Sequence, residues 1–240
     1  VAVGESQAFG GVASGSFSLA RSNAGTALKT QMQFADIDLN QGLARLIGIR
    51  RVEGKGTLVL NLDSTGGSIH EIAQRLNGTA NLTSRKGAIT GINAELLLRR
   101  LERNPLASRS DFRSGQTPFD LLALNLTVTQ GIANVEDMRL EAPSVRLALA
   151  GSASIPARDL DLKGVAKLMT ARDSASTFEL PFMVAGPWDN PLIWPDAQAL
   201  ISRSGAAAPL LDAVRSRLRR KPAPDADVTS SPGRPIAPPR

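Results

Sequence analysis

The segment from residue 115 to 155 alternates apolar side chains with polar or small ones in three successive runs. A period of two is typical of β-strands, because consecutive side chains of a strand lie on opposite faces. The turn sequences Gln130-Gly131 and Ala142-Pro143-Ser144 separate the runs. The segment therefore predicts three antiparallel strands, each with one apolar face. The apolar positions are Leu122, Leu124, Leu126 and Val128, then Met138 and Leu140, then Val145, Leu147, Leu149 and Gly151.

The same alternation extends over most of the chain and predicts about nine or ten strands. Only three short helices interrupt it, near 38–48, 68–76 and 92–103. Asp38 with Gln41, and Ser68 with Glu71, have the spacing of capping pairs at the start of the first two helices. Outside the central segment, the strands with the clearest apolar faces carry Leu58, Leu60 and Leu62, then Leu162, then Phe178, Leu180 and Phe182.

These elements predict a mainly β fold with a few short helices, in the α+β class, built on a curved and largely antiparallel sheet. Three short helices cannot cover so many apolar strand faces. Either the sheet folds onto itself as a sandwich, or it curls into a groove whose inner face stays apolar. Residues 1–204 are predicted to form this sheet domain.

Residues 205–240 are predicted to be a linker, a basic amphipathic helix and a Pro-rich disordered tail. The chain has a formal net charge of +6, and seven basic against two acidic residues lie between Arg215 and Arg240. The high pI therefore describes the tail and not the sheet domain. Two interpretations of the helix stay open: contact with an anionic membrane or a partner protein, or a solvated charged terminus. Under the first, the contacting residues are Arg215, Arg219 and Arg220.

Neither a catalytic site nor a metal site is predicted. The chain has no cysteine and one histidine, His70, which is interpreted as a surface residue at a helix N-terminus. The carboxylate pairs Asp36/Asp38 and Asp159/Asp161 lack the further oxygen ligands of a calcium loop and are interpreted as parts of a solvated face. With 4% aromatic residues and no tyrosine, nucleic-acid binding by base stacking is disfavoured as well. We therefore expect neither an enzyme nor a cofactor.

The first residues support one further expectation. The chain begins Val-Ala-Val without methionine, and it has neither a signal peptide nor an apolar run of about 18 residues. We therefore expect a segment of a longer protein whose targeting segment lies upstream.

A series of short motifs follows a fixed order along the chain. It begins with Gly54-Lys55-Gly56-Thr57-Leu58, Gly67-Ser68, Leu76-Asn77-Gly78-Thr79-Ala80 and Lys86-Gly87-Ala88-Ile89-Thr90-Gly91-Ile92-Asn93. It continues with Thr117-Pro118-Phe119, Gln130-Gly131, Leu140-Glu141-Ala142-Pro143, Gly151-Ser152-Ala153, Leu180-Pro181-Phe182, Gly186, Asn190-Pro191 and Pro195-Asp196. Each motif is commonplace alone. In this order and spacing, from about Gly11 to Leu200, they resemble the C-terminal region of the AsmA family.

The resemblance implies a bacterial envelope protein that an N-terminal helix anchors in the inner membrane, with its body in the periplasm. It also implies a long β-sheet groove lined by apolar side chains and related to bridge-like lipid-transfer proteins. Roles in outer-membrane lipid homeostasis and in assembly of outer-membrane proteins follow from the same resemblance. The Arg-rich and Pro-rich tail lies outside the shared pattern, so none of this is carried over to it.

We expect a non-enzymatic segment that binds phospholipid acyl chains on the apolar face of its sheet and serves phospholipid transport. Acyl chains need only an apolar surface that excludes water, which agrees with the lack of a polar site. The alternative is a scaffold or regulator of outer-membrane protein assembly, with a closed sandwich, no ligand groove of its own, and envelope protein partners at its strand edges or Arg-rich helix. The side chains expected to face lipid are Leu58, Leu60, Leu62, Leu122, Leu124, Leu126, Leu147, Leu149, Leu162, Phe178, Leu180 and Phe182.

Overall fold

The structure is a computed structural model that describes residues 2–22, 25–103, 114–169 and 176–199. The chain divides into two compact units, Val1–Leu200 and Ile201–Arg240. The second unit lies outside the described residues, and with it lie the predicted linker, the basic helix and the Pro-rich tail.

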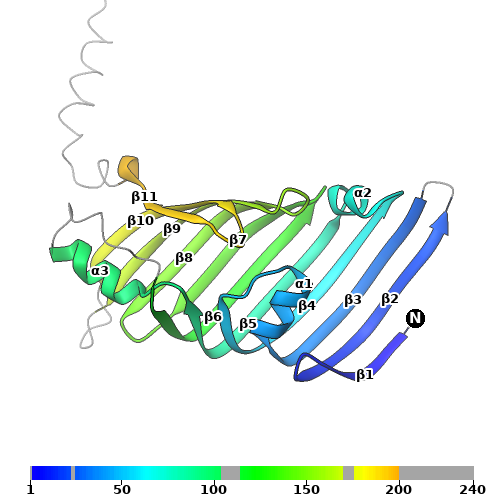
Figure 1. Cartoon of the computed structure of the whole chain (residues 1–240), viewed down its shortest axis with the longest axis horizontal. Coiled ribbons are helices and arrows are strands. Elements are labelled where there is room, and N and C mark those ends of the chain that lie inside the picture. Colours follow the sequence, from blue (N-terminus) through cyan, green and yellow to red (C-terminus); the bar gives the residue numbers. More distant parts are fainter. Residues whose placement is uncertain (1, 23–24, 104–113, 170–175, 200–240) are drawn as a thin grey trace, which may run out of the picture. The chain divides into compact units, whose positions relative to one another are not determined.

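Within the described residues, eleven strands form one antiparallel sheet (Figure 1). Each strand pairs with the strands that precede and follow it in the sequence, so the whole sheet is a meander. The strands are β1 (Ala2–Ala8), β2 (Gly11–Ser22), β3 (Gly25–Asp38), β4 (Val52–Gly66), β5 (Asn77–Thr90), β6 (Gln116–Thr129), β7 (Ile132–Glu141), β8 (Val145–Ser154), β9 (Asp159–Met169), β10 (Ser176–Pro187) and β11 (Leu192–Pro195).

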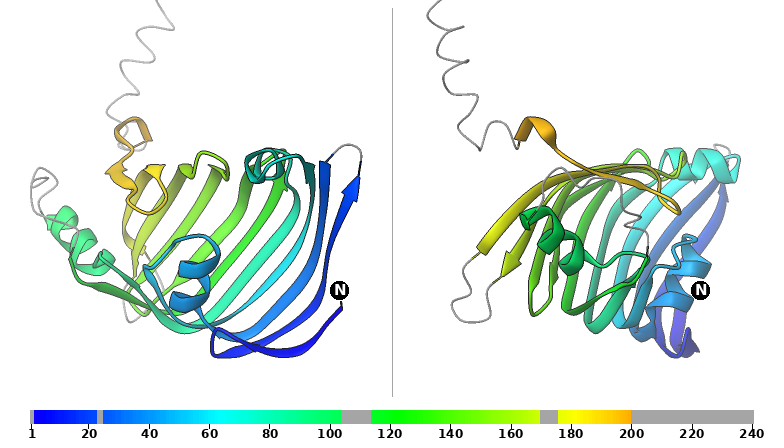
Figure 2. Two further views of the ribbon diagram at one scale, coloured as in Figure 1. Left: turned by 45° about the vertical axis from the view of Figure 1, so that its right-hand side comes forward. Right: turned by 60° about the vertical axis from the view of Figure 1, so that its left-hand side comes forward.

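Three helices lie in successive connections of this meander. Because the strand ends alternate between the two ends of the sheet, α1 and α3 lie at one end and α2 lies at the other (Figures 1 and 2). The helices are α1 (Leu39–Leu46) after β3, α2 (Ile69–Gln74) after β4 and α3 (Ala94–Arg103) after β5.

Side-chain caps begin all three helices. The Asp38 carboxylate accepts a hydrogen bond from the backbone N–H of Gln41 at 2.9 Å, and the Ser68 hydroxyl accepts one from the N–H of Glu71 at 3.2 Å. Asn93 caps α3 in the same way. Each cap satisfies a backbone donor that has no partner inside its helix, so the local sequence fixes where each helix starts.

The sheet is curved because several strands carry bulges or glycines with unusual backbone angles (Figure 2). Asp36 in β3 and Lys86 in β5 have positive φ values of 53° and 60°, and the strand register shifts next to both positions. Gly15, Gly78 and Gly151 have φ values of 137°, 135° and 142° inside strands. Such residues increase the local twist and bend the sheet toward one side.

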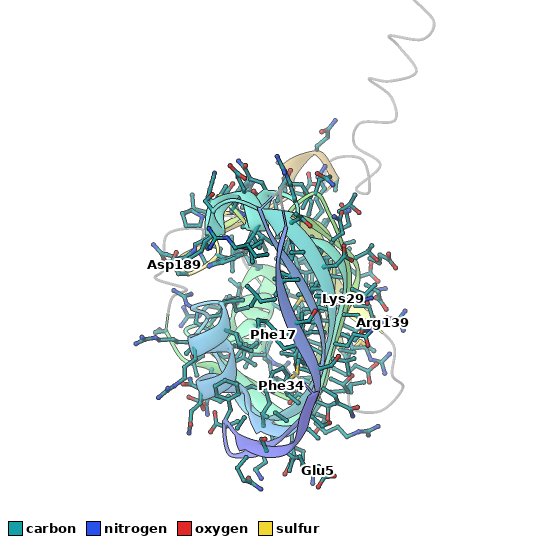
Figure 3. The ribbon with its side chains drawn as sticks, turned by 90° about the vertical axis from the view of Figure 1, so that its right-hand side faces the viewer. Glu5, Phe17, Lys29, Phe34, Arg139 and Asp189 are labelled. Carbon is teal, nitrogen blue, oxygen red and sulfur yellow. The ribbon has the colours of Figure 1, made fainter. Side chains whose placement is uncertain are left out.

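The strand register collects apolar side chains on the concave face of the sheet. Phe17 and Phe34 lie on this concave side, whereas Lys29 and Arg139 lie on the convex side (Figure 3). Residues that pair directly across antiparallel strands share a face. One row of paired residues across β3 to β7 consists of Phe34, Leu58, Leu82, Leu124 and Met138.

The predicted fold class is confirmed: the described chain is mainly β, with an antiparallel, curved and open sheet. The sandwich alternative does not form within these residues, since all strands belong to one sheet. The sequence Lys86-Gly87, which is typical of a turn, does not end β5. β5 continues to Thr90, because the positive φ of Lys86 makes a bulge and not a reversal. β1 adds a strand that the sequence did not indicate, since it contains only one large apolar residue, Val3.

Two of the helices pack on the concave face and form two apolar clusters. α1 contributes Leu39 and Leu43 to the first cluster, and α3 contributes Ala94, Leu98 and Leu101 to the second. From the sheet, the first cluster takes Ala13, Phe34, Ile37, Leu58, Leu82, Phe119, Leu122 and Leu140. The second takes Val135, Val145, Leu162, Ala166, Leu168, Leu180, Phe182 and Val184.

Thr117 fixes the start of α3 to β6. Its hydroxyl donates to the carbonyl of Ile92 at 2.8 Å and accepts from the N–H of Ala94 at 3.0 Å, and the residue is 3% exposed. Thr117→Val keeps the shape but removes both bonds, so we expect a loss of about 2 kcal/mol in the free energy of unfolding. Urea unfolding measures the loss, and amide hydrogen exchange should be faster in α3. Thr83→Val, on the exposed side of β5, should change neither, and unchanged α3 exchange in Thr117→Val would contradict the assignment.

Candidate functional site

The strand pairing places all twelve predicted side chains on the concave face. Three rows hold ten of them, because strict alternation along each strand is kept in register across the sheet. The first row contains Leu122, Leu147 and Leu180; the second contains Leu58, Leu124, Leu149 and Phe182; the third contains Leu60, Leu126 and Leu162. Leu62 lies one row further toward α2, and Phe178 lies beside the first row at its β10 end, paired with Leu168.

The twelve side chains differ in how far they are covered. Five are buried, with 9% exposure or less: Leu58, Leu122, Leu162, Leu180 and Phe182. The other seven are partly exposed: Leu60, Leu62, Leu124, Leu126, Leu147, Leu149 and Phe178. The concave face therefore has covered regions and an accessible apolar band of leucines between and beside them.

The positions of α1 and α3 explain this pattern. Leu58 and Leu122 belong to the cluster under α1, whereas Leu162, Leu180 and Phe182 belong to the cluster under α3. α1 packs on β3 and β4, and α3 packs on β6, β9 and β10. Four partly buried residues border both clusters and so lie between the two covered regions: Leu124, Met138, Ala142 and Leu147.

The buried polar side chains of the concave face have hydrogen-bond partners within the protein. Ser84 is 1% exposed and donates to the carbonyl of Lys55 at 2.7 Å, and Ser64 is 5% exposed and donates to the carbonyl of Ile72 in α2 at 2.6 Å. Thr117 is satisfied at the start of α3. Within the described part of β3 to β10, the concave-facing rows include no charged side chain. This face therefore offers contact to apolar groups and no fixed charge to a reacting group.

The charged residues of the strands lie mainly on the convex face, and several are paired there. Lys167 and Glu179, opposite each other on β9 and β10, form an ion pair at 2.7 Å, and Arg139 pairs with Asp137 at 2.9 Å. Exposed pairs of this kind contribute about 0–1 kcal/mol each. Their main consequence is a polar convex face opposite the apolar concave one.

The sequence prediction omits several residues of the same rows. Three omitted residues lie among the predicted leucines: Phe34, Leu82 and Met138. The run from Thr79 to Ser84 shows no apolar alternation, because Leu82 is its only large apolar residue. Met138 was predicted on an apolar strand face, but only the register shows that all three residues share a row with Leu58 and Leu124. Phe17 and Leu19, near the β1 edge, are 38% and 58% exposed on the same face and were omitted for the same reason.

The remaining candidate residues have separate positions. Asp36 forms an ion pair with Lys55 at 2.9 Å, while Asp38 caps α1, so these two carboxylates do not act together. His70, in the first turn of α2, lies 3.0 Å from the Gln74 side chain. Arg215, Arg219 and Arg220, predicted to contact a membrane or partner, lie outside the described residues.

Comparison with known proteins adds one match. Searches of the curated proteins and of the solved structures found none. Among the described residues, no helix has both the length and the apolar character needed to cross a membrane. The family comparison matches residues 6–138, which include β2 to β6, the three helices, and all buried residues of the cluster under α1 except Leu140. This match covers more than half of the chain, and the chain belongs to the AsmA family.

Proposed function

We propose that this chain binds the acyl chains of phospholipids on its concave face, as the periplasmic part of an envelope protein that transports phospholipid. The observation that carries the proposal is the charge-free apolar face across β3 to β10, part of which α1 and α3 leave accessible. Membership of a bacterial envelope family supports the cellular setting. Under this proposal the chain is not an enzyme and needs no cofactor.

The dimensions of the face suit an acyl chain. Neighbouring strands lie about 4.8 Å apart, so a row from β4 to β10 extends over about 29 Å. The hydrocarbon core of a bilayer is about 30 Å thick, and each leaflet contributes about half of it. A row is therefore longer than one extended acyl chain. Burial of a chain is favourable by about 0.8 kcal/mol per methylene and requires no specific polar contact.

The open sheet also bears on the alternative function. A scaffold without a ligand site was expected to have a closed sandwich, with its apolar residues sealed between two layers. The partly exposed Leu60, Leu124, Leu126 and Leu149 favour lipid binding instead. Inner-membrane anchoring through a segment outside this chain, and contacts with envelope protein partners, are parts of the proposal that rest on the family alone.

Native mass spectrometry of the full chain, purified from a bacterial host, tests the proposal. We expect adducts of phospholipid mass, and we expect lipid extraction to identify two-chain phospholipids in them. A chain that carries no lipid, and takes up none from phospholipid in mild detergent, would contradict the proposal.

A further inference from the structure

Arginines gather on the elements that border the concave face at one end. The described residues contain 17 basic and 17 acidic side chains and are neutral in total. α1 with its following loop to Glu53, together with α3, contains six arginines, no lysine and three carboxylates. These elements therefore carry a net charge of +3, and the remaining described residues carry −3. At the opposite end, the negative charge of Glu71 in α2 and the positive charge of the nearby Arg75 cancel.

Arg51 joins the two basic elements. Its carbonyl accepts the N–H of Thr90 at 2.9 Å, which ties the loop after α1 to the end of β5. Its guanidinium Nη1 lies 3.7 Å from where a Cβ on Gly91 would stand, and Gly91 has a φ of 87° just before α3. The carbonyl of Arg50 accepts from the Asn40 side chain of α1 at 3.0 Å. These two hydrogen bonds fix the backbone of Arg50 and Arg51 between α1 and α3.

Most of these arginines have no carboxylate partner among the described residues. Arg99 is paired with Glu95 at 2.9 Å within α3. No ion pair within the described residues involves the side chains of the other five: Arg45, Arg50, Arg51, Arg100 and Arg103. Unpaired arginines beside an apolar surface fit an anionic group, because the guanidinium fork matches the oxygens of a phosphate.

A phospholipid combines the two chemistries at this end of the sheet. Its chains can lie on rows without charge, but its phosphate cannot follow them there, since an unpaired charge on an apolar surface is costly. We propose that the arginines of α1, its following loop and α3 bind the anionic phosphate headgroup of the lipid whose chains lie on the concave face. The inference rests on the proposed function and adds a position: the headgroup lies at the α1–α3 border of the concave face, and the chains lie on the charge-free rows beside it.

Two lipids with the same chains and two charge-matched variants test this inference. The probes are dioleoylphosphatidylglycerol, which carries a phosphate, and dioleoylglycerol, which does not. Arg51→Gln with Arg100→Gln changes the basic elements, and Arg85→Gln with Arg146→Gln changes the convex side by the same charge. The basic tail is present in every variant, so its contribution is the same throughout. Lipid bound per protein is measured by native mass spectrometry after delivery from mild detergent.

We expect the Arg51/Arg100 variant to bind about fivefold less phosphatidylglycerol and an unchanged amount of dioleoylglycerol. The Arg85/Arg146 variant should match the parent chain with both lipids. Equal losses of both lipids, or no loss of either, would overturn the inference. If the parent chain binds neither lipid, the proposed function itself fails, so the two failures are distinct.

A docking surface for the membrane itself is the remaining outcome. Flotation measures how much protein binds to vesicles of dioleoylphosphatidylglycerol. In a Leu149→Asp protein, whose concave face is blocked to acyl chains, flotation reports binding to the membrane surface alone. Headgroup binding predicts that the Arg51/Arg100 substitutions leave the flotation of that blocked chain unchanged. Reduced flotation of the blocked chain would assign the arginines to the membrane surface and overturn the inference.

Discussion

Leu149→Asp is expected to yield a folded protein that carries about a hundredfold less lipid than the parent chain. Leu149 lies in the middle of the β4–β10 row, where it pairs with Met138 and Gly164. An aspartate in hydrocarbon costs about 2.5–3.5 kcal/mol, which corresponds to about a hundredfold in binding. When no lipid is bound, the new carboxylate can stay hydrated, because position 149 is only partly buried.

Ala148→Asp is the matched control. Ala148 is the neighbouring residue of β8, lies opposite Arg139 and Val165, and is exposed on the convex face. It receives the same carboxylate one residue earlier on the strand, on the other side of the sheet. Lipid bound per protein, from native mass spectrometry, should match the parent chain. Circular dichroism and urea unfolding should show both variants folded. Parent-level lipid in a folded Leu149→Asp protein would mean that the chains lie elsewhere.

The choice of Leu149 depends on the helices. Leu122 and Leu162 lie in the two neighbouring rows, but they are buried members of the clusters that include α1 and α3, at 2% and 7% exposure. A carboxylate there would have no access to water and would destabilise the fold, so a loss of lipid could not be assigned to the surface. Arg substitution at Leu149 should act as Asp does, because the cost comes from charge and not from its sign.

Much of the fold follows from the sequence because a strand period of two is simple to read. Leu58, Leu60 and Leu62 define a face on β4, and Leu122, Leu124 and Leu126 define one on β6. Antiparallel pairing of neighbours in the sequence then places these faces together. The alternation does not show what packs against the apolar face. A sandwich and an open curved sheet need the same pattern, and only the bulges and glycines that bend the sheet separate them.

The accessible part of the face could not be predicted for a related reason. In the sequence Leu58 and Leu60 are equivalent, yet Leu58 is 7% exposed and Leu60 is partly exposed. Leu58 belongs to the buried cluster that Leu39 and Leu43 of α1 help to form, whereas Leu60 lies at the border of that cluster. The apolar stripe of a helix predicts that it packs on something, but not on which row of a distant strand. Phe34 was left out of the lipid-facing set for the same reason: only the strand register places it in the row of Leu58.

Gly78→Ala is expected to lower the free energy of unfolding by about 3 kcal/mol or more, because an unfavourable backbone angle and a steric clash act together. Gly78 has a φ of 135°, which only glycine adopts readily. A Cβ there would overlap the carbonyl oxygen of Asn61 and lie 2.9 Å from the Cα of Leu62, both on β4. Relief of the clash requires β4 and β5 to separate, at the position where Gly78 pairs with Leu62 and with Val128 of β6.

Gly4→Ala is the control, since a Cβ on Gly4 would meet no atom within 4 Å and its φ is not positive. Urea unfolding at an unchanged slope compares the two variants. A loss below about 1 kcal/mol for Gly78→Ala, the usual effect of a surface change, would mean that the backbone relaxes without cost. Gly15 and Gly151 have the same geometry on β2 and β8, each against a backbone carbonyl of the next strand. A second result to look for is a Gly78→Ala protein that folds and still binds less lipid than the parent chain. That result would mean that sheet curvature and lipid binding depend on the same glycines, because these residues permit the bend that makes the apolar face concave.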